Sequence, residues 1–298
     1  SGSLLRLRTV LDKEENMHFQ FETNLRYRAA QKMGLKQMKR NEKMGDGLNP
    51  QELDTILNDS MEAVRVELGV MDIPTDQIVG IADGTGKNLY AASFMPVSSA
   101  NSSYASQWRK LCEEYRSDKE FLSPLYCYEY LGKFYLIDGK KRVSVLKYLG
   151  IPTAKAYVTR IVPMLSDDKE SKLYREFLKN FELTKLYQVS FSKLGSFEKL
   201  QKAMGHVEGE KWSDEDRNLI LQELRRVAPA LESAFGGYLN VTPADALLVL
   251  LEECPLKQIQ KMAVSVMTDR LQRNWKKLYS ICHWDIAPCE GESKKEAS

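Results

Sequence analysis

The chain has 298 residues, of which 43% are hydrophobic and 28% are charged, and its formal net charge at pH 7 is +2. This length allows two or three domains, and the composition is that of a soluble globular protein rather than a disordered or membrane-spanning one. A net charge this small does not by itself indicate nucleic-acid binding, so such a function has to show in local clusters of cations.

The cysteines and histidines do not indicate a metal centre. The five cysteines are widely spaced without a CxxC pair, and none of the three histidines stands in a ligand pattern with a nearby Cys or Glu. Cysteines of this kind are typical of reduced thiols. We therefore expect a cytoplasmic protein with no metal site and no membrane segment.

Residues 24–43 form a basic segment in which Glu42 is the single acid. Four of its cations recur every four residues and would form one stripe on a helix: Arg28, Lys32, Lys36 and Arg40. A weak apolar side is expected from Leu25, Ala29, Met33 and Met38. The stripe predicts an arm that binds DNA or RNA; the alternative is a solvated helix face or a contact with acidic protein.

Two further helices complete the expected N-terminal region. Asn49-Pro50 is a typical helix start and predicts a helix to about residue 58. Another helix is expected over residues 60–68. We therefore predict that residues 1–70 are a helical, basic arm.

The most informative segment is 125–161. Tyrosines at 126, 128 and 130 alternate at the two-residue period of a strand, and residues 134–137 form a second strand after a short turn at Leu131-Gly132. Asp138-Gly139 then ends the strand. Residues 140–148 have helical spacing, Gly150 is a natural C-terminal cap, and residues 154–161 return as a strand.

A glycine and three cations at the first turn of a helix are typical of an anion site. The free backbone N–H groups and the positive end of the helix dipole point the same way. Gly139 would remove a side chain where a phosphate oxygen approaches, and Lys140, Lys141 and Arg142 would balance its charge. Asp138 would cap the loop through its carboxylate. The alternative is an ordinary strand–helix turn with its cations in solvent.

This strand–DGKKR–helix–LG–strand unit resembles the ParB/sulfiredoxin-like superfamily, whose loop reads roughly G-x-[RH]-R. The resemblance extends upstream to the segment 71–80, MDIPTDQIVG, and covers about residues 71–163. It implies an α+β protein: a small mixed α/β domain over 71–163, flanked by the N-terminal helices and by a helical C-terminal domain over 164–298.

The resemblance also implies a ligand. ParB proteins bind CTP on this loop and clamp on DNA, sulfiredoxins bind ATP and use a cysteine in the loop, and other relatives are free-serine kinases. Lys140 stands where sulfiredoxin has its cysteine, which argues against that chemistry. The implied cofactor is a nucleoside triphosphate, CTP or ATP, with Mg²⁺ bridging its phosphates.

After Pro163 the pattern is helical. Helices are expected over 167–181, within 190–204, from Ser213 to about Phe235 and from Thr242-Pro243 to about Glu253. Ser213 and Asp216 have the spacing of a capping box, and Gly236-Gly237 would stop the helix that they begin.

Residues 242–279 loosely resemble a helix-turn-helix of the kind that ends sigma factors. Its last helix would bring four cations to DNA phosphates and three polar residues to base edges: Arg270, Arg273, Lys276 and Lys277, and Thr268, Asp269 and Gln272. The alternative is a plain helical bundle in which Leu271, Trp275 and Leu278 are core residues.

Three functions remain open from the sequence. The first is a ParB-like DNA-binding protein regulated by a nucleotide. The second is a small-molecule kinase on the same fold, with Asp76 or Asp83 as base. The third is a non-catalytic interaction protein of bacterial or mobile-element origin. The sequence contains no acidic cluster of the kind that a two-metal nuclease requires. Whether the protein is an enzyme or a homodimer is left open.

Overall fold

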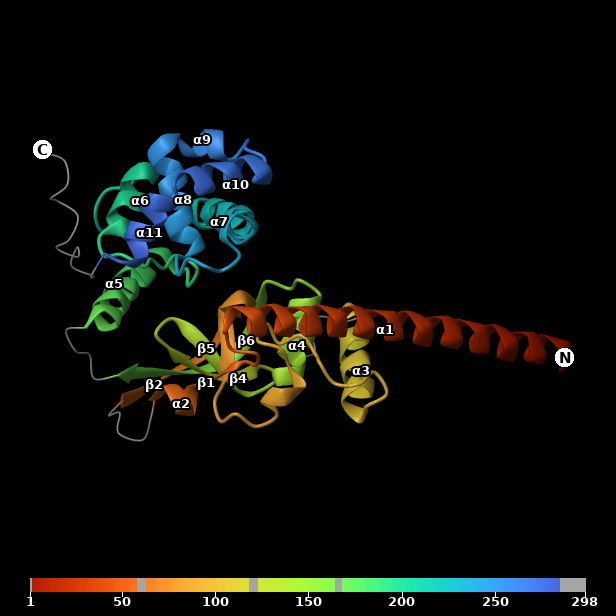
Figure 1. Cartoon of the computed structure of the whole chain (residues 1–298). Helices are drawn as coiled ribbons and strands as arrows, with labels where there is room; N and C mark the ends of the chain where they lie inside the picture. Colours follow the sequence, from red (N-terminus) through yellow and green to blue (C-terminus); the bar gives the residue numbers. More distant parts are fainter. Residues whose placement is uncertain (1, 58–62, 118–122, 164–167, 285–298) are drawn as a thin grey trace, which may run out of the picture. The chain divides into compact units, whose positions relative to one another are not determined.

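Figure 1 shows the computed structural model of the chain. The structure describes the backbone of residues 2–57, 63–117, 123–163 and 168–284, and side chains within these ranges from residue 21 onward. The chain divides into two compact units, Ser1–Met164 and Leu165–Ser298. The first contains the sheet and the second is helical, so the predicted α+β class is confirmed.

The first unit is built on a six-stranded mixed sheet with the order β1-β3-β5-β4-β6-β2. Its strands are β1 (Gln51–Glu52), β2 (Ala63–Pro74), β3 (Ile78–Ile81), β4 (Leu125–Tyr130), β5 (Lys133–Asp138) and β6 (Thr153–Pro163). The pairs β4–β5 and β2–β6 are antiparallel, whereas β1–β3, β3–β5 and β4–β6 are parallel.

Four helices and two short 3₁₀ turns accompany the sheet. They are α1 (Gly2–Met44), α2 (Leu53–Leu57), α3 (Ser103–Ser117), α4 (Lys140–Tyr148), η1 (Thr75–Gln77) and η2 (Lys87–Leu89). Helix α1 packs on α3, and α3 packs on α4 (Figure 1). Trp108 of α3 contacts both other helices. The centre of its ring lies 5.4 Å from that of Tyr27 in α1, and its Nε1 donates a hydrogen bond to Oγ of Ser144 in α4 at 2.9 Å.

The prediction of which residues form the apolar side of the basic segment was wrong. Leu25 and Met33 are 50% and 54% exposed, whereas Tyr27 and Ala30 are fully buried. Gly34 completes this inner face, because a Cβ there would lie 2.8 Å from the carbonyl oxygen of Pro96. The helix is therefore anchored by one tyrosine and two small residues, which a search for large aliphatic side chains overlooks.

Of the two further helices predicted in the N-terminal region, the first is present only as the short α2 and the second is wrong. Asn49 does not cap a helix, because its Nδ2 donates to the carbonyls of Lys87 and Tyr90, and α2 begins only at Leu53. Of the helix expected over 60–68, the described part from Ala63 is strand β2, which pairs with β6. Residues 1–70 consequently contribute two strands and belong to the same compact unit as the sheet.

The second unit is a bundle with α5 (Lys169–Thr184), α6 (Ser196–Met204), α7 (Asp214–Phe235), α8 (Pro243–Glu253), α9 (Leu256–Ile259), α10 (Val264–Arg273) and α11 (Trp275–Cys282). Helix α8 is buried over most of its length and forms the centre of the core. The capping box of Ser213 and Asp216 begins α7 as predicted, and Gly236 ends it. No helix in the described ranges combines the length and the apolar character that crossing a membrane requires.

Candidate functional site

The DGKKR loop joins β5 to α4. The bounds of these two elements agree closely with those predicted from the sequence. Gly139 is the N-cap of α4 with φ +99°, a conformation that favours glycine, and no side chain caps the helix. The expectation that Gly139 leaves room for a phosphate oxygen was wrong. A Cβ at this position would overlap Leu125 and would lie 3.1 Å from Nη2 of Arg142, so protein atoms already fill that space.

Lys140 reaches from the first turn of α4 to the loop that follows β3. Its Nζ donates to the carbonyl oxygen of Thr85 at 2.7 Å and lies 3.5 Å from Oδ1 of Asp83. This loop is shaped by Gly84 and Gly86, which both have positive φ. Lys140 therefore holds the loop against the helix end that the sequence identified as an anion site.

Lys141 points to α3 instead. Its Nζ donates to Oε1 of Gln107 and lies 5.2 Å from the centre of the Tyr104 ring. Burial against α3 lowers the pKa of this lysine from its usual value.

Arg142 turns back toward the end of β5. Its guanidinium donates to the carbonyls of Ser123 and Pro124 and to Oδ2 of Asp138, the last at 3.1 Å. With 15% of its side chain exposed, Arg142 fastens the loop together. The structure thus places the three cations around one helix end but directs them to three different partners.

The arrangement can still bind an anion at the helix end. The first turn of α4 has no side-chain cap. Lys140 donates to the carbonyl of Thr85 as well as pairing with Asp83, and Lys141 donates to the side-chain amide of Gln107, so a phosphate could replace a neutral acceptor of each lysine with a charged one. The carboxylates of Asp83 and Asp138 are 58% and 72% exposed beside the turn. Carboxylate oxygens are the ligands that Mg²⁺ takes together with phosphates, so these two residues could hold it.

The two carboxylates suggested as bases are separated in the structure. Asp76 lies in η1, where its charge interacts with Lys133 and with Lys147 at the far end of α4, and burial raises its pKa. Asp83 lies beside Lys140, but hydrogen bonds from Thr85 lower its pKa, which weakens it as a base. The geometry therefore favours binding at the turn over catalysis.

Sequence reasoning missed the lysine pair beside Asp76. Nζ of Lys147 donates to the carbonyl of Ile78 at 2.7 Å, and Nζ of Lys133 donates to Gln77 at 2.6 Å. Burial lowers the pKa of Lys147 to about 8 and also lowers that of Lys133. Neither lysine stands in a sequence pattern that distinguishes it from a surface cation.

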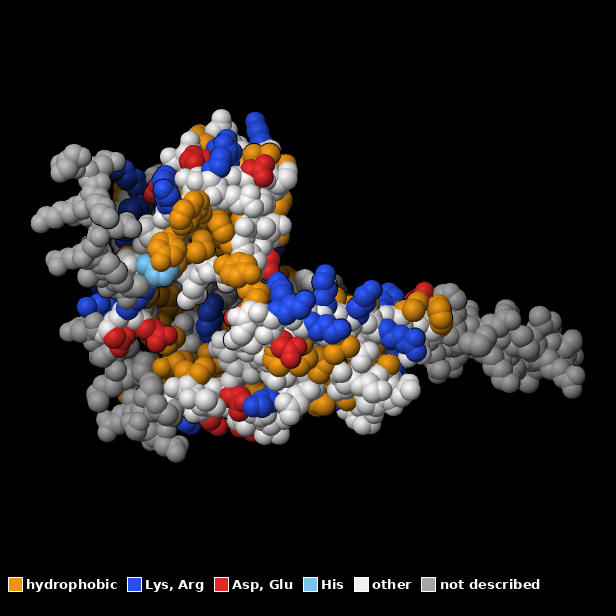
Figure 2. Space-filling view, in the orientation of Figure 1, with side chains coloured by type: hydrophobic (Ala, Val, Ile, Leu, Met, Phe, Trp, Pro, Cys, Tyr) orange, Lys and Arg blue, Asp and Glu red, His pale blue; other side chains and the backbone are white. Residues whose placement is uncertain are grey.

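The cations of the basic stripe, Arg28, Lys32, Lys36 and Arg40, are all exposed on α1. They lie away from the anchoring face of Tyr27, Ala30 and Gly34, and Figure 2 shows Lys and Arg side chains following the described part of this helix. Arg26, outside the stripe, pairs with Glu22 and Glu113. The four cations of the predicted stripe therefore all lie on the exposed side of α1.

The prediction of a single last helix in the segment 242–279 was wrong, because the structure has two helices there, α10 and α11. Asn274, with φ −94° and ψ 18°, ends α10 and separates it from α11. Arg270 pairs with Glu253 at 3.2 Å and Lys277 with Glu252 at 3.1 Å, so two of the four expected DNA contacts face acids of α8.

The remaining residues of this segment are placed as follows. Arg273 Nε donates to the carbonyl of Asp269, Lys276 lies 5.9 Å from the Trp275 ring, and the Thr268 hydroxyl donates to backbone carbonyls. Leu271 and Leu278 are buried as the bundle alternative expected, whereas Trp275 is 49% exposed.

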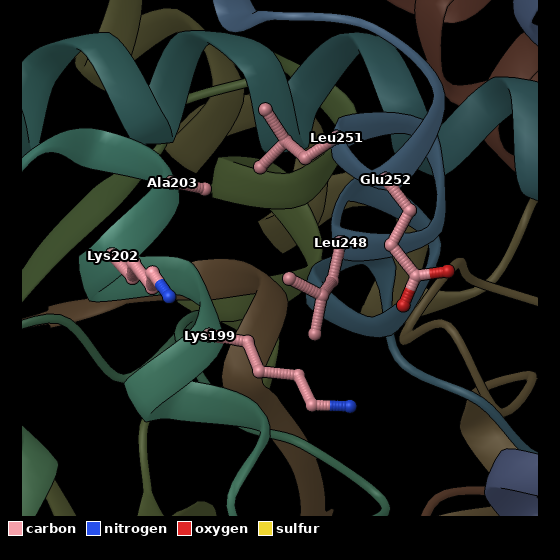
Figure 3. Close-up of a pocket in the computed structure, with 6 residues that line it drawn as sticks. All are labelled: Lys199, Lys202, Ala203, Leu248, Leu251 and Glu252. Carbon is pink, nitrogen blue, oxygen red and sulfur yellow. The ribbon is translucent and has the colours of Figure 1, made fainter.

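A small pocket of about 310 Å³ lies between α6 and α8 (Figure 3). Ala203, Leu248 and Leu251 give it an apolar floor, and its rim consists of Lys199, Lys202 and Glu252. None of its six lining residues is a buried polar side chain that would select a ligand, and no sequence motif marks it.

Comparison with known proteins adds little. No protein-family model and no curated protein matches the chain. A solved structure described as the C2221 form of a Pnob8-like ParB-N domain is 15% identical over 76% of this chain and 78% of that chain, with a TM-score of 0.21. A TM-score this low does not establish a shared fold.

Proposed function

We propose that this protein is a ParB-like DNA-binding protein whose α1 stripe contacts the phosphate backbone. The observation that carries the proposal is the row of four exposed cations at a spacing of four on a helix whose opposite face is buried. Successive cations rise by about 6 Å along the helix, so a rigid, anchored α1 presents them as a linear array. Contacts of this kind position a protein on DNA without reading its sequence.

The salt dependence of DNA binding tests this proposal. Fluorescence anisotropy of a labelled duplex should give a log–log salt slope that becomes shallower by about 3–4 when R28Q, K32Q, K36Q and R40Q are combined, because each lost phosphate contact removes about 0.9. A control with the same net charge carries K199Q, K202Q, K257Q and K261Q. Equal slopes for the two quadruple variants would refute the role of the stripe.

We further propose that a nucleoside triphosphate with Mg²⁺ binds at the first turn of α4 and regulates DNA binding. The uncapped turn, the two lysines beside it and the exposed carboxylates of Asp83 and Asp138 support this. The phosphate oxygens would replace Thr85 and Gln107 as hydrogen-bond acceptors of the ammonium groups of Lys140 and Lys141. Arg142 would keep its partners and act as a clamp of the loop.

A thermal-shift titration with CTP, ATP and GTP, each with Mg²⁺, tests the ligand. The bound nucleotide should raise Tm in the wild type but not in K140Q/K141Q, since binding to the folded state alone stabilises it. K110Q, an exposed lysine of α3, is the matched control. If no nucleotide raises Tm, or if the double variant responds like the wild type, the nucleotide part of the proposal fails while the stripe stands on its own test.

A further inference from the structure

Strand β2 leaves one end of the sheet uncovered. It is the last strand in the sheet order and, within the described residues, pairs with β6 alone. With twelve residues it is much longer than β1, the two-residue strand at the opposite end. A long outer strand presents a row of backbone donors and acceptors that another strand can use.

The side chains of this strand are unusually open. Val64, Val66 and Val70 are 65%, 41% and 50% exposed. A β-bulge between Glu67 and Gly69 divides the ladder into two regular segments, residues 63–67 and 69–74. All five side chains of the segment 63–67 are exposed, whereas the segment 69–74 ends in two buried residues. Natural proteins rarely leave such an apolar edge unprotected, so its composition has to be explained.

The charges on the segment 63–67 are self-complementary. Arg65 and Glu67 share one face of the strand with Val66 between them, and they flank it symmetrically. If a second β2 pairs antiparallel about a two-fold axis at Val66, Arg65 of each copy lies opposite Glu67 of the other. Opposite charges in directly paired positions stabilise antiparallel strands, whereas like charges destabilise them.

Within one chain, both side chains remain available for this contact. Arg65 stacks over the Tyr128 ring at 5.3 Å, and Glu67 accepts a hydrogen bond from the Thr159 hydroxyl at 3.0 Å. Both neighbours are neutral, so each charge keeps the capacity for an ion pair. Their shared face also keeps the two cross-copy pairs on the same side of the joined sheet.

We propose that a second copy of this chain docks on β2, so that the two sheets join through antiparallel β2 strands centred on Val66. The symmetry is that of an isologous dimer, in which each copy gives and receives the same contact. The segment 63–67 is short, so the dimer should dissociate on dilution. This inference does not depend on DNA or nucleotide binding.

Charge reversal in the full chain tests the proposal by sedimentation velocity over a concentration series. The wild type should dimerise, and R65E and E67R should each weaken self-association by about tenfold or more, because each reversal creates two like-charge pairs. An equimolar mixture of R65E and E67R should recover the dimer, and so should the double variant R65E/E67R. R273E, in the second unit, is the control for a change of charge alone.

Several results would overturn the proposal. A wild type that stays monomeric throughout the series would refute a second copy as the occupant of this edge. Unchanged association in both single variants, or a mixture that does not associate, would exclude this register. Far-ultraviolet circular dichroism and Tm of each variant show whether it is folded, and the mixture and the double variant keep the test valid if one single variant is unstable.

Discussion

The N-termini of α8 and α4 are built in opposite ways. Thr242 and Asp245 close α8 with a reciprocal capping box, and Asp245 also accepts from the backbone N–H of Ser192. Helix α4 begins at Gly139 without a side-chain cap, and cations surround it. A helix end whose donors are satisfied internally serves the fold, whereas one left uncapped among cations remains available to an anion. This contrast distinguishes a structural terminus from a candidate binding site.

The largest expected effect lies at α8. Asp245→Ala should reduce the free energy of unfolding by about 3 kcal/mol, because the carboxylate is fully buried and its loss leaves the N–H groups of Thr242 and Ser192 without acceptors. The matched change Asp216→Ala, in the capping box of α7 at the surface, should cost about 1 kcal/mol. Urea denaturation measures both; equal losses would show that burial of the α8 cap adds nothing.

The next effect concerns the glycine that begins α4. Gly139→Ala should destabilise the protein by about 2 kcal/mol, because a side chain at positive φ is strained and the new Cβ would displace Leu125. Gly150 also has a positive φ, +68° against +99° at Gly139, but open space around its Cβ, so Gly150→Ala should cost about 1 kcal/mol. The same denaturation measurement compares them, and a smaller loss at Gly139 would contradict the close packing described for the loop.

Arg142→Ala should cost about 2 kcal/mol, because Arg142 joins the first turn of α4 to two backbone carbonyls and to Asp138. Lys141→Ala should change stability by less than about 0.5 kcal/mol, since Lys141 is only partly buried and, among the described residues, makes a single hydrogen bond, to Gln107 of α3. The Tm values of the two variants show whether Arg142 stabilises the loop or instead binds the ligand. A stable Arg142→Ala protein that loses its response to nucleotide would assign Arg142 to the ligand instead.

The smallest effect is a pH dependence at the other end of α4. The pKa of Lys147 is lowered to about 8 in the folded protein, so the unfolded chain holds this proton more tightly. The folded protein should therefore become more stable, relative to Lys147→Met, as pH rises from 8 toward the unfolded pKa. Between pH 7 and 9 the free energy of unfolding of the wild type should rise by about 1 kcal/mol relative to that of Lys147→Met.

Denaturation of both proteins at pH 7, 8 and 9 measures this effect, with Lys155→Met, an exposed lysine on β6, as control. A constant difference between wild type and Lys147→Met across this range would contradict the buried position of the ammonium group.

The local pattern of the sequence predicted much of the fold. The strand, turn and helix around Gly139 agree closely with β4, β5 and α4. The capping box of Ser213 begins α7 as predicted, and α8 begins at the predicted Thr242-Pro243. These features depend on residues within one or two turns of each other, so spacing and residue type suffice. The break at Asn274 was missed because nothing in its neighbours interrupts the helical period.

The candidate site was predicted in position but not in arrangement. Sequence placed Lys140, Lys141 and Arg142 at one helix end, and that much is correct. Their acceptors, however, belong to the loop after β3, to α3 and to the segment before β4. These segments are distant along the chain, and no local rule says which of them a long cationic side chain will reach.

By itself, therefore, the sequence determined the strand–glycine–helix unit and the cation stripe, because short-range periodicity and capping encode them. The α+β class followed from the resemblance that this unit carries. Only the tertiary structure decided that residues 63–68 form an outer strand rather than a helix, and that each loop cation has its own partner. Strand pairing and side-chain hydrogen bonds join residues far apart in the chain, and packing alone brings those residues together.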